Sequence, residues 1–326
     1  MTNLTDEMFH DNDAARVYFE KMRWPNGQFC PHCGNADPET ITGLAGTSHR
    51  KGLYQCNACR EPFTVTVGGV MESSHIPLCK WALAFHLMAA SKKGVSAHQL
   101  MRTLGLGSYR TAWFMAHRVR EAMKIDNKDN PIGGSGKVVE VDETYQGRRE
   151  NPRVVRTSGQ PFIKKGKKGT PAKRPVVALV ERGGETRMFH VENATAANLR
   201  DVMVRNIKRE SELHTDESRL YTEMGKEFDG HHTVKHSAGE YVRYEGERTV
   251  HSNTVENVFS VFKRGMTGVY QHCGEAHLHR YLAEFEFRYN RRAGLGWNDS
   301  WRADEAVKGA EGKRLMYRQP REAGHA

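Results

Sequence analysis

An acidic pair stands at the end of an apolar run in a basic chain. Asp142 and Glu143 directly follow VVEV at 138–141, and the β-branched residues of that run favour a strand. A strand interior disfavours aspartate. A carboxylate at the point where apolar packing stops must be solvated, paired or bound to a cation. Asp142 is therefore a candidate cation ligand, provided that other acids reach the same place.

Two further acids fit the same chemistry. Asp216 ends the predicted strand ELHTDES much as Asp142 ends the earlier one. If residues 251–265 form a helix, Glu256 and Lys263 are seven positions apart and differ by about 20° in direction. Two strand-end aspartates and a helix glutamate can hold two Mg²⁺ ions about 4 Å apart, one to activate a hydroxyl group or water and one to stabilise the leaving oxygen.

Four of the six cysteines form two C-x2-C pairs, CPHC and CNAC, with 22 residues between the pairs. Each pair presents two thiolates from one tight turn, and two such turns complete a tetrahedral zinc site. The predicted ligands are Cys30, Cys33, Cys56 and Cys59. Strands are expected to enter and leave the second pair, as in a zinc ribbon. The zinc should be structural, because four protein ligands leave no position for substrate.

The composition indicates a polyanionic partner. The chain holds 49 Lys and Arg against 39 Asp and Glu, with a net charge of +10 and a pI near 9.3, which favours nucleic acid. No apolar run approaches the roughly 18 residues of a membrane span, and the acidic N-terminus has no signal-peptide core. We expect a cytoplasmic protein, nucleoid-associated when bound to DNA, without a membrane partner, whose paired cysteines bind metal.

A helical rhythm follows the cysteines. Helices ending at Gly94 and Gly105 precede a third at 109–123, in which His117 and Arg120 are expected on a basic face. Two helices joined by a glycine turn, the second of them basic and amphipathic, are the outline of a DNA-binding helix-turn-helix. A plain helical connector fits the pattern about as well.

These patterns divide the chain into four segments. Residues 1–72 should form the zinc ribbon with a preceding helix, and 73–128 the helical segment. A Gly-rich linker, 125–137, leads to 137–292, where three strands, a helix and a fourth strand predict a mixed sheet as in ribonuclease-H-like nucleases. Residues 293–326 are expected to be a C-terminal tail. The fold class is therefore a multidomain α+β or α/β protein.

Residues 148–174 hold ten Lys or Arg and one Glu. Their Gly and Pro content disfavours regular structure, so we expect a hairpin or loop beside the first acid. Either the loop is merely solvated or it contacts DNA phosphates, and its position directly after Asp142 favours the second alternative. The candidate DNA-binding lysines are Lys164, Lys165, Lys167 and Lys168.

Nearly the whole chain resembles the zinc-ribbon-bearing DDE transposases of bacterial insertion sequences. The resemblance runs from CPHC through VEVDETYQG and HTDES to HSNTVENVFSVFKRGMTGVYQHCGEAHLHRYLAEFEFRYNRR. It implies a ribonuclease-H-like catalytic domain, Mg²⁺-dependent cleavage at the element ends and strand transfer into target DNA. It also implies a homo-oligomer when the protein is bound to the terminal repeats.

By motif, the resemblance implies roles for individual residues. Asp142, Asp216 and Glu256 look like the acidic triad that binds Mg²⁺, with Lys263 as the lysine that follows the third acid. Some members of the family carry asparagine as the third residue. Asn253 lies one turn before Glu256, so either of the two could contact the metal.

Two further features of the family are matched. Glu143 is expected to have a neighbouring rather than a primary role. Glu284, Arg288 and Arg291 match an accessory Glu–Arg–Arg set at positions i, i+4 and i+7. These residues could orient the metal carboxylates or touch a phosphate, or they could form an exposed ion pair of little consequence.

Three functions fit these observations. The first is a transposase. The second is a DNA-binding regulator that uses the zinc ribbon and helix-turn-helix beside a catalytically inert third domain. The third is a nuclease that cuts without joining. Glu256 and Lys263 favour the transposase over the regulator, which has no use for either residue. The nuclease would use the same ions, and the family resemblance alone speaks against it.

Overall fold

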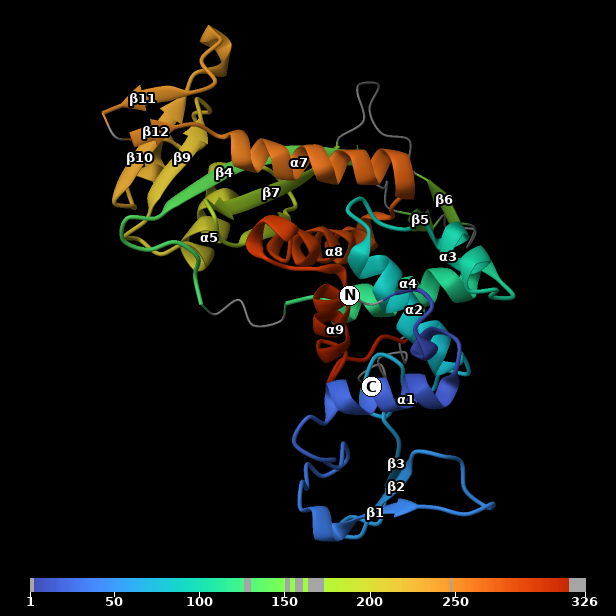
Figure 1. Cartoon of the computed structure of the whole chain (residues 1–326). Helices are drawn as coiled ribbons and strands as arrows, with labels where there is room; N and C mark the ends of the chain where they lie inside the picture. The colour runs from blue at the N-terminus through green and yellow to red at the C-terminus, as the bar shows by residue number, and fades with distance from the viewer. Residues whose placement is uncertain are drawn as a thin grey trace. The chain divides into compact units, whose positions relative to one another are not determined.

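The chain folds into two compact units in a computed structural model (Figure 1). One unit comprises Met1–Lys124 and Arg291–Ala326, and the other comprises Ile125–Asn290. The structure describes residues 3–125, 130–149, 153–155, 161–163, 173–246 and 248–316. Within these ranges no helix is both long enough and apolar enough to span a bilayer.

The first unit begins with two helices, η1 (Glu7–Phe9) and α1 (Asn12–Arg23). Asp11 caps α1 by accepting hydrogen bonds from the N–H groups of Asp13 and Ala14, as expected of an N-cap aspartate. The ribbon follows as η2 (Pro38–Thr40) and three short antiparallel strands, β1 (Ile41–Leu44), β2 (Leu53–Cys56) and β3 (Pro62–Phe63). The predicted zinc-ribbon architecture is therefore present.

Three helices follow the ribbon, as predicted: α2 (Leu78–Ala90), α3 (Ala97–Thr103) and α4 (Tyr109–Met123). Ser96 caps α3 and Ser108 caps α4, each accepting a backbone N–H at 3.1 Å. The predicted basic face of α4 is wrong at two positions, because His117 and Arg120 are 1% and 2% exposed. Both side chains are buried, so they are not part of a solvent-facing basic surface.

The segment expected to be a C-terminal tail instead contributes to the first unit. It contains η6 (Ala293–Leu295) and α9 (Asp299–Lys308), and α9 packs against α1, α2 and α4. The Tyr18 hydroxyl on α1 donates to Asp304 at 2.8 Å. After α9, the Val70 N–H donates to the Ala310 carbonyl at 3.1 Å. Residues 293–312 are therefore integral to this unit.

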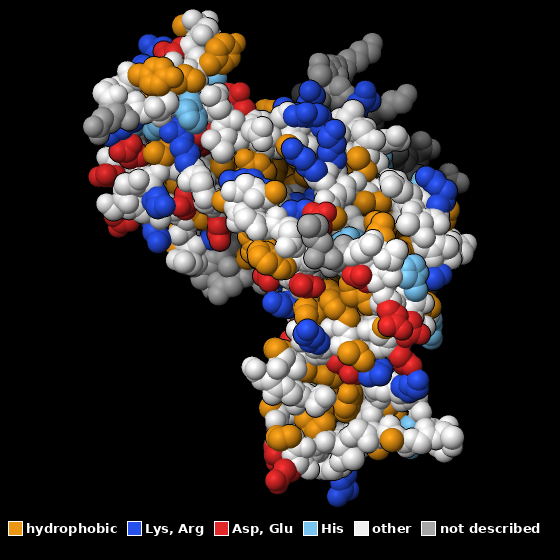
Figure 2. Space-filling model, in the orientation of Figure 1, with side chains coloured by type: hydrophobic (Ala, Val, Ile, Leu, Met, Phe, Trp, Pro, Cys, Tyr) orange, Lys and Arg blue, Asp and Glu red, His pale blue; other side chains and the backbone are white. Residues whose placement is uncertain are grey.

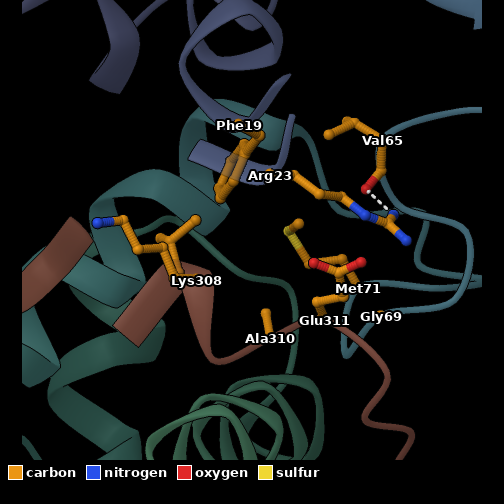
Figure 3. Close-up of a pocket in the computed structure, with 9 residues that line it drawn as sticks. Phe19, Arg23, Val65, Gly69, Met71, Lys308, Ala310 and Glu311 are labelled. Atoms are coloured by element: carbon orange, nitrogen blue, oxygen red, sulfur yellow. Dashed lines mark hydrogen bonds between the residues drawn. The ribbon is translucent and has the colours of Figure 1, made fainter. Parts of the chain in front are cut away.

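Arg23 fastens the chain that leaves the ribbon. Its guanidinium donates to the carbonyls of Val65 at 2.7 Å and Val67 at 2.5 Å (Figure 3). Gly69 lies in the same segment, where a Cβ would stand 3.1 Å from the Ala310 carbonyl oxygen. The close approach of these two backbones leaves little room for a side chain at position 69.

The second unit is built on a five-stranded sheet in the order β10-β9-β4-β7-β8. The strands are β4 (Val138–Arg148), β7 (Lys173–Glu181), β8 (Thr186–His190), β9 (Glu212–Asp216) and β10 (Gly230–Val234). The first three are antiparallel neighbours, whereas β9 runs parallel to β4 and β10 parallel to β9. This is the predicted ribonuclease-H-like mixed sheet, extended by a fifth strand.

Helices cover both faces of this sheet (Figure 1). Helices α7 (Asn253–Gly265) and α8 (Leu278–Asn290) share a core with Val176, Ala178 and Val180 of β7. Helix α5 (Ala196–Asn206) shares the opposite core with the alternate residues Val177 and Leu179. Strand β7 is thus buried on both faces, which explains its continuous apolar run.

Shorter elements complete the second unit. Strands β5 (Arg153–Val155) and β6 (Pro161–Ile163) pair in the region predicted as a basic hairpin or loop. A hairpin of β11 (Arg243–Glu245) and β12 (Arg248–Val250) stands between β10 and α7. The remaining pieces are α6 (Thr222–Gly225), η3 (His236–Ala238), η4 (Met266–Tyr270) and η5 (Glu275–His277).

Candidate active site and metal centre

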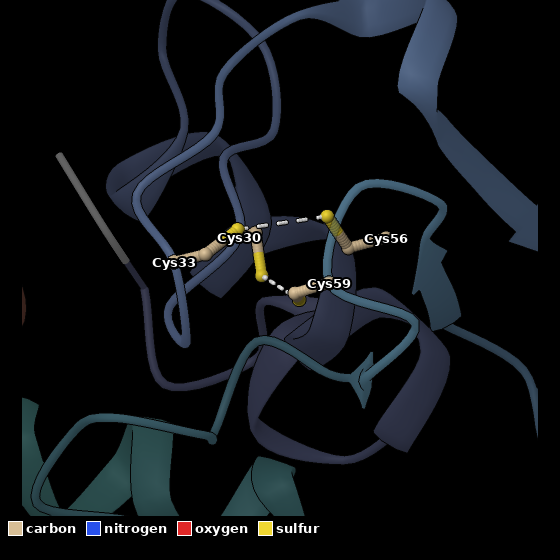
Figure 4. A group of neighbouring side chains, drawn as sticks. All are labelled: Cys30, Cys33, Cys56 and Cys59. Carbon is tan, nitrogen blue, oxygen red and sulfur yellow. Dashed lines mark hydrogen bonds between the residues drawn. The ribbon is translucent and has the colours of Figure 1, made fainter.

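The four paired cysteines converge on one point (Figure 4). Their sulfur atoms all lie within 4.8 Å of one another, with Cys30–Cys59 at 3.6 Å and Cys33–Cys56 at 3.8 Å. Four sulfurs placed tetrahedrally about 2.3 Å from a zinc ion would stand about 3.8 Å apart. The donor set and its spacing therefore fit a structural zinc ion.

Both cysteine turns close in the same way. The residue after each second cysteine, Gly34 or Arg60, has a positive φ of 76° or 62°. Its N–H donates to the carbonyl of the first cysteine, Cys30 at 2.9 Å or Cys56 at 2.7 Å. Backbone N–H groups from Cys59 and Ala58 lower the pKa of Cys56 to about 6, whereas burial and the neighbouring thiols raise the pKa of Cys33 and Cys59. Zinc binding would favour the thiolate form of all four.

Parallel pairing of β4 and β9 brings the two predicted strand-end aspartates together. Glu140 stands opposite His214 in this pairing. Asp142 and Asp216 each follow two residues later, so they lie at the same level and on the same face of neighbouring strands. Asp216 ends β9 as predicted, whereas the prediction that Asp142 ends its strand is wrong, because β4 continues to Arg148 along β7. Asp142 stands opposite Ala178 of the neighbouring strand β7. Ala178 belongs to the core that α7 and α8 cover. Both aspartates therefore lie on the face that α7 covers.

Helix α7 supplies the other side of the site. An open pocket of about 470 Å³ lies between residues 142–144, within β4, and α7. It is lined by Asp142, Glu143, Thr144, Glu256, Phe259, Ser260, Lys263 and Arg264. The predicted Glu256 and Lys263 thus face one space with Asp142. Asn253 is exposed at the start of α7 and is not part of this lining.

The acids repel one another where they meet. Burial, together with the nearby charges of Glu143, Asp216 and Glu256, raises the pKa of Asp142 to about 7. A bound cation would remove this penalty, because it favours the ionised form. Among the residues described, the cysteines form the one group with three or more such ligand atoms all within 4.8 Å. The three acids therefore do not surround a single point, whereas two ions that share Asp142 would not require them to.

Protein groups hold two of the surrounding acids. Glu143 accepts a hydrogen bond from the buried Tyr221 hydroxyl, and its own N–H donates to Asp142 at 2.8 Å. Burial raises the pKa of Glu143. The Glu256 carboxylate accepts from the Ser252 hydroxyl at 3.1 Å and lies 3.2 Å from His236 Nε2. These contacts orient both acids from outside the pocket.

The Glu–Arg–Arg set does not form one exposed cluster. Glu284 and Arg288 form an ion pair in the interior, with side chains 0% and 5% exposed. The Tyr270 hydroxyl also donates to Glu284 at 2.5 Å. Arg291 follows the end of α8 and pairs with Glu305 at 3.2 Å. The exposed-pair alternative is therefore wrong for Glu284 and Arg288, which tie α8 to the preceding turn.

Two sets of residues complete the comparison with the sequence. The candidate DNA-binding lysines Lys164, Lys165, Lys167 and Lys168 lie outside the described residues. Sequence reasoning missed Glu140, which is completely buried in β4 and contacts the start of α7. An acid in the middle of an apolar strand was its signal, because such a group needs partners in the interior.

Two family models match this chain. The transposase zinc-ribbon domain matches residues 10–61, and the ISXO2-like transposase domain matches residues 134–290. The chain thus carries a transposase zinc-ribbon domain followed by an ISXO2-like transposase domain. This transposase is 28% identical, over 287 residues, to an uncharacterized protein in the transposable element ISH50 of Halobacterium salinarum. That match covers 86% of this chain and 91% of the relative.

Two solved structures are loosely similar to the transposase. One is a simian T-cell lymphotropic virus intasome in complex with PP2A regulatory subunit B56 gamma, with a TM-score of 0.27 and 13% identity, covering 57% of this chain and 63% of the other. The second is a pre-cleavage Mos1 transpososome, with a TM-score of 0.26 and 10% identity, covering 69% and 76%.

The ribbon should depend on zinc. Purified protein should contain about one zinc ion per chain, and replacing both Cys30 and Cys33 by serine should remove it and unfold the ribbon, because zinc binding supplies folding free energy there. Zinc content by atomic absorption and circular dichroism test this expectation. Cys79→Ser is the matched control, since Cys79 lies outside the cluster. Full zinc content in the double variant would contradict the assignment.

Asp142 should destabilise the Mg²⁺-free protein at alkaline pH. Its folded pKa of about 7 exceeds the unfolded value of about 3.9, so the proton-linked stabilisation is lost as pH rises through 7. Asp142→Asn should therefore unfold at a higher temperature than wild type at pH 8.5, with the difference shrinking toward pH 6. Thermal unfolding in Mg²⁺-free buffer without chelator measures this. Parallel curves for the two proteins would contradict it.

Proposed function

We propose that this transposase cleaves DNA at the ends of its element and joins the ends to target DNA, using Asp142, Asp216 and Glu256 to hold two Mg²⁺ ions. The observation that carries the proposal is the convergence of these acids where β4, β9 and α7 meet, with Asp142 at a raised pKa of about 7. Apolar packing would not place mutually repelling carboxylates there, whereas divalent cations would stabilise them.

The donor set fits Mg²⁺, which prefers carboxylate oxygens and retains several of its waters. When bound, such ions would activate the attacking oxygen and stabilise the leaving oxygen. The charges of both other acids act on Asp142, so Asp142 would be suited to contact both ions. Asp216 would complete one site from β9, and Glu256 the other from α7. Tyr221 would hold Glu143 beside them.

Positive charge on the same helix would position the DNA strand. Lys263 and Arg264 are exposed, line the pocket and follow Glu256 by about two turns. Figure 2 shows Lys and Arg side chains gathered along α7. Arg264 donates to the Ser260 hydroxyl at 2.6 Å and is held against the helix. Lys263 would contact a phosphate beside the ions, because an ammonium group suits a point contact with phosphate.

The third ligand is proposed to be Glu256 rather than Asn253. Glu256 lines the pocket and its charge raises the pKa of Asp142, whereas Asn253 is outside that lining. A carboxylate also balances the charge of Mg²⁺, which a neutral amide cannot do. Asn253, at the exposed first position of α7, would at most orient neighbouring groups.

A strand-transfer assay with pre-cut ends at saturating Mg²⁺ separates these roles. Asp142→Asn, Asp216→Asn and Glu256→Gln should lose at least about 100-fold in rate while retaining DNA binding, because phosphate contacts elsewhere supply most of the affinity. Asn253→Ala is the matched control and should keep a measurable fraction. An active Glu256→Gln beside an inactive Asn253→Ala would exchange the two roles. Cleavage without any joining by the wild type would identify a nuclease instead.

Sequence-independent affinity is proposed to come from the basic segment 148–174. Ten cationic residues directly after the first acid would meet the phosphates of DNA bound at the pocket. We also propose that the protein forms a homo-oligomer when it is bound to the terminal repeats. The helical segment, residues 73–128, is proposed to contact DNA. As a DNA-acting protein, it is proposed to work in the cytoplasm.

Neutralising Lys164, Lys165, Lys167 and Lys168 to glutamine should reduce the salt dependence of DNA binding. Each lost phosphate contact should change the slope of log affinity against log salt by up to about 0.9. Binding to a duplex without terminal-repeat sequence, measured by fluorescence anisotropy at several salt concentrations, isolates this electrostatic contribution. An unchanged slope would mean that these lysines are merely solvated.

A further inference from the structure

Glu140 anchors helix α7 to the central strand. Its side chain is completely buried in β4, two residues before Asp142. One carboxylate oxygen accepts the N–H groups of Thr254 and Val255 at 2.8 and 3.0 Å. The other accepts the Thr254 hydroxyl at 2.9 Å. Backbone N–H groups in the first turn of a helix have no partner within the helix, so Glu140 satisfies two of them and complements the helix dipole.

Arg182 joins this carboxylate to a third element. Its Nε donates to Glu140 at 2.7 Å, and its remaining nitrogens donate to the carbonyls of Thr249 and His251, each at 2.8 Å. Arg182 also lies 3.0 Å from Nδ1 of His214 on β9. His214 accepts this hydrogen bond through Nδ1, because a guanidinium group can only donate.

The hydrogen-bonded network of Glu140, Arg182, His214 and Thr254 includes one residue from each element that carries a proposed metal ligand. In each element the network residue precedes the ligand by the same number of positions. Glu140 precedes Asp142 by two residues, and His214 precedes Asp216 by two. Thr254 likewise precedes Glu256 by two. In the strands this offset places network member and ligand on the same face, and in α7 both belong to the first turn. One buried group of hydrogen bonds therefore fixes the backbone two residues before each of the three proposed ligands.

We propose that the Glu140–Arg182 pair is a positioning device that sets the spacing of Asp142, Asp216 and Glu256 for two Mg²⁺ ions. This inference rests on the proposed function of those acids. Replacing a buried ion pair by apolar side chains is often neutral or stabilising, so general stability is a weak reason for this pair. Its multiple directional hydrogen bonds instead specify one geometry of β4, β9 and α7. Mg²⁺ demands that precision because it tolerates little departure from octahedral coordination.

The test compares two isosteric substitutions. Glu140→Gln keeps the size of the side chain but removes its charge and one acceptor oxygen. Glu181→Gln is the matched control, because Glu181 on β7 also accepts a backbone N–H, from Gly133 at 3.0 Å, and pairs with Lys137 at 3.6 Å. Among the described residues, Glu181 forms no hydrogen bond or ion pair with α7. Isothermal titration of the full-length, zinc-loaded protein with Mg²⁺ alone gives the affinity, and strand transfer with pre-cut ends gives the rate.

Glu140→Gln should bind Mg²⁺ about tenfold or more weakly than wild type, with strand transfer reduced and partly restored at high Mg²⁺ concentration. Glu181→Gln should match wild type within about twofold. Thr254→Val provides a milder second variant if Glu140→Gln does not fold, since it removes the hydroxyl donor and keeps both N–H groups. It should also weaken Mg²⁺ binding at wild-type circular dichroism.

Each outcome bears on a separate claim. Wild-type Mg²⁺ affinity in a folded Glu140→Gln or Thr254→Val protein would overturn the positioning role. Equal losses in Glu140→Gln and Glu181→Gln would also overturn it, because the effect would then reflect general destabilisation. The proposed metal site itself fails if Asp142→Asn retains wild-type Mg²⁺ affinity and strand transfer. A dead Asp142→Asn beside a fully active Glu140→Gln would leave the site intact and reject the positioning inference alone.

Discussion

The candidate active site depends on the parallel pairing of β9 with β4. Antiparallel neighbours alternate in direction, so the β4, β7 and β8 strands alone could not place a strand that runs parallel to β4 beside it. The crossover through α5 returns the chain in the required direction. Asp142 and Asp216 then lie close together because each follows the paired positions Glu140 and His214 by two residues, although β9 ends at Asp216 and β4 continues to Arg148. Burial of β4 and β7 under helices on both faces keeps this register, since a one-residue slip would exchange the two faces.

Repulsion among the carboxylates at the candidate active site destabilises the folded protein. Elsewhere in the described parts of the chain, many acids pair with Arg or Lys, as Glu212 does with Arg248. At the pocket, Asp142 meets other carboxylates, and its pKa rises accordingly. Such local conflict is typical of functional sites. The buried Glu140 beside the site differs from Asp142, because its carboxylate accepts hydrogen bonds from Arg182 and from the start of α7.

The ribbon solves a different physical problem. Its strands are four, four and two residues long, too short to bury a substantial core of their own. Four thiolates at the spacing of a zinc tetrahedron supply the missing cross-links. Stacked and edge-on rings of Trp24, Tyr54 and Phe63 add a small apolar cluster beside them. The segment that leaves the ribbon is then held by Arg23 and by the backbone after α9.

Local patterns in the sequence were sufficient for much of this organisation. The C-x2-C turns, the three helices after the ribbon and the position of Asp216 at the end of a strand each depend on residues within one turn, helix or strand, where spacing fixes geometry. Three strands, a helix and a fourth strand also predicted the mixed sheet. Glu256 and Lys263 could be placed on one helix face for the same reason.

Only the tertiary structure decided which distant groups meet. Glu140 finds its partner on α7 more than a hundred positions along the chain, at Thr254. Arg291 pairs with Glu305, and the expected tail supplies α9. His117 and Arg120 were expected on a basic face but are buried. Local spacing determines which side chains share a face of one helix or strand. Burial and long-range hydrogen bonds depend on which of these faces pack together, and the chain as a whole determines that.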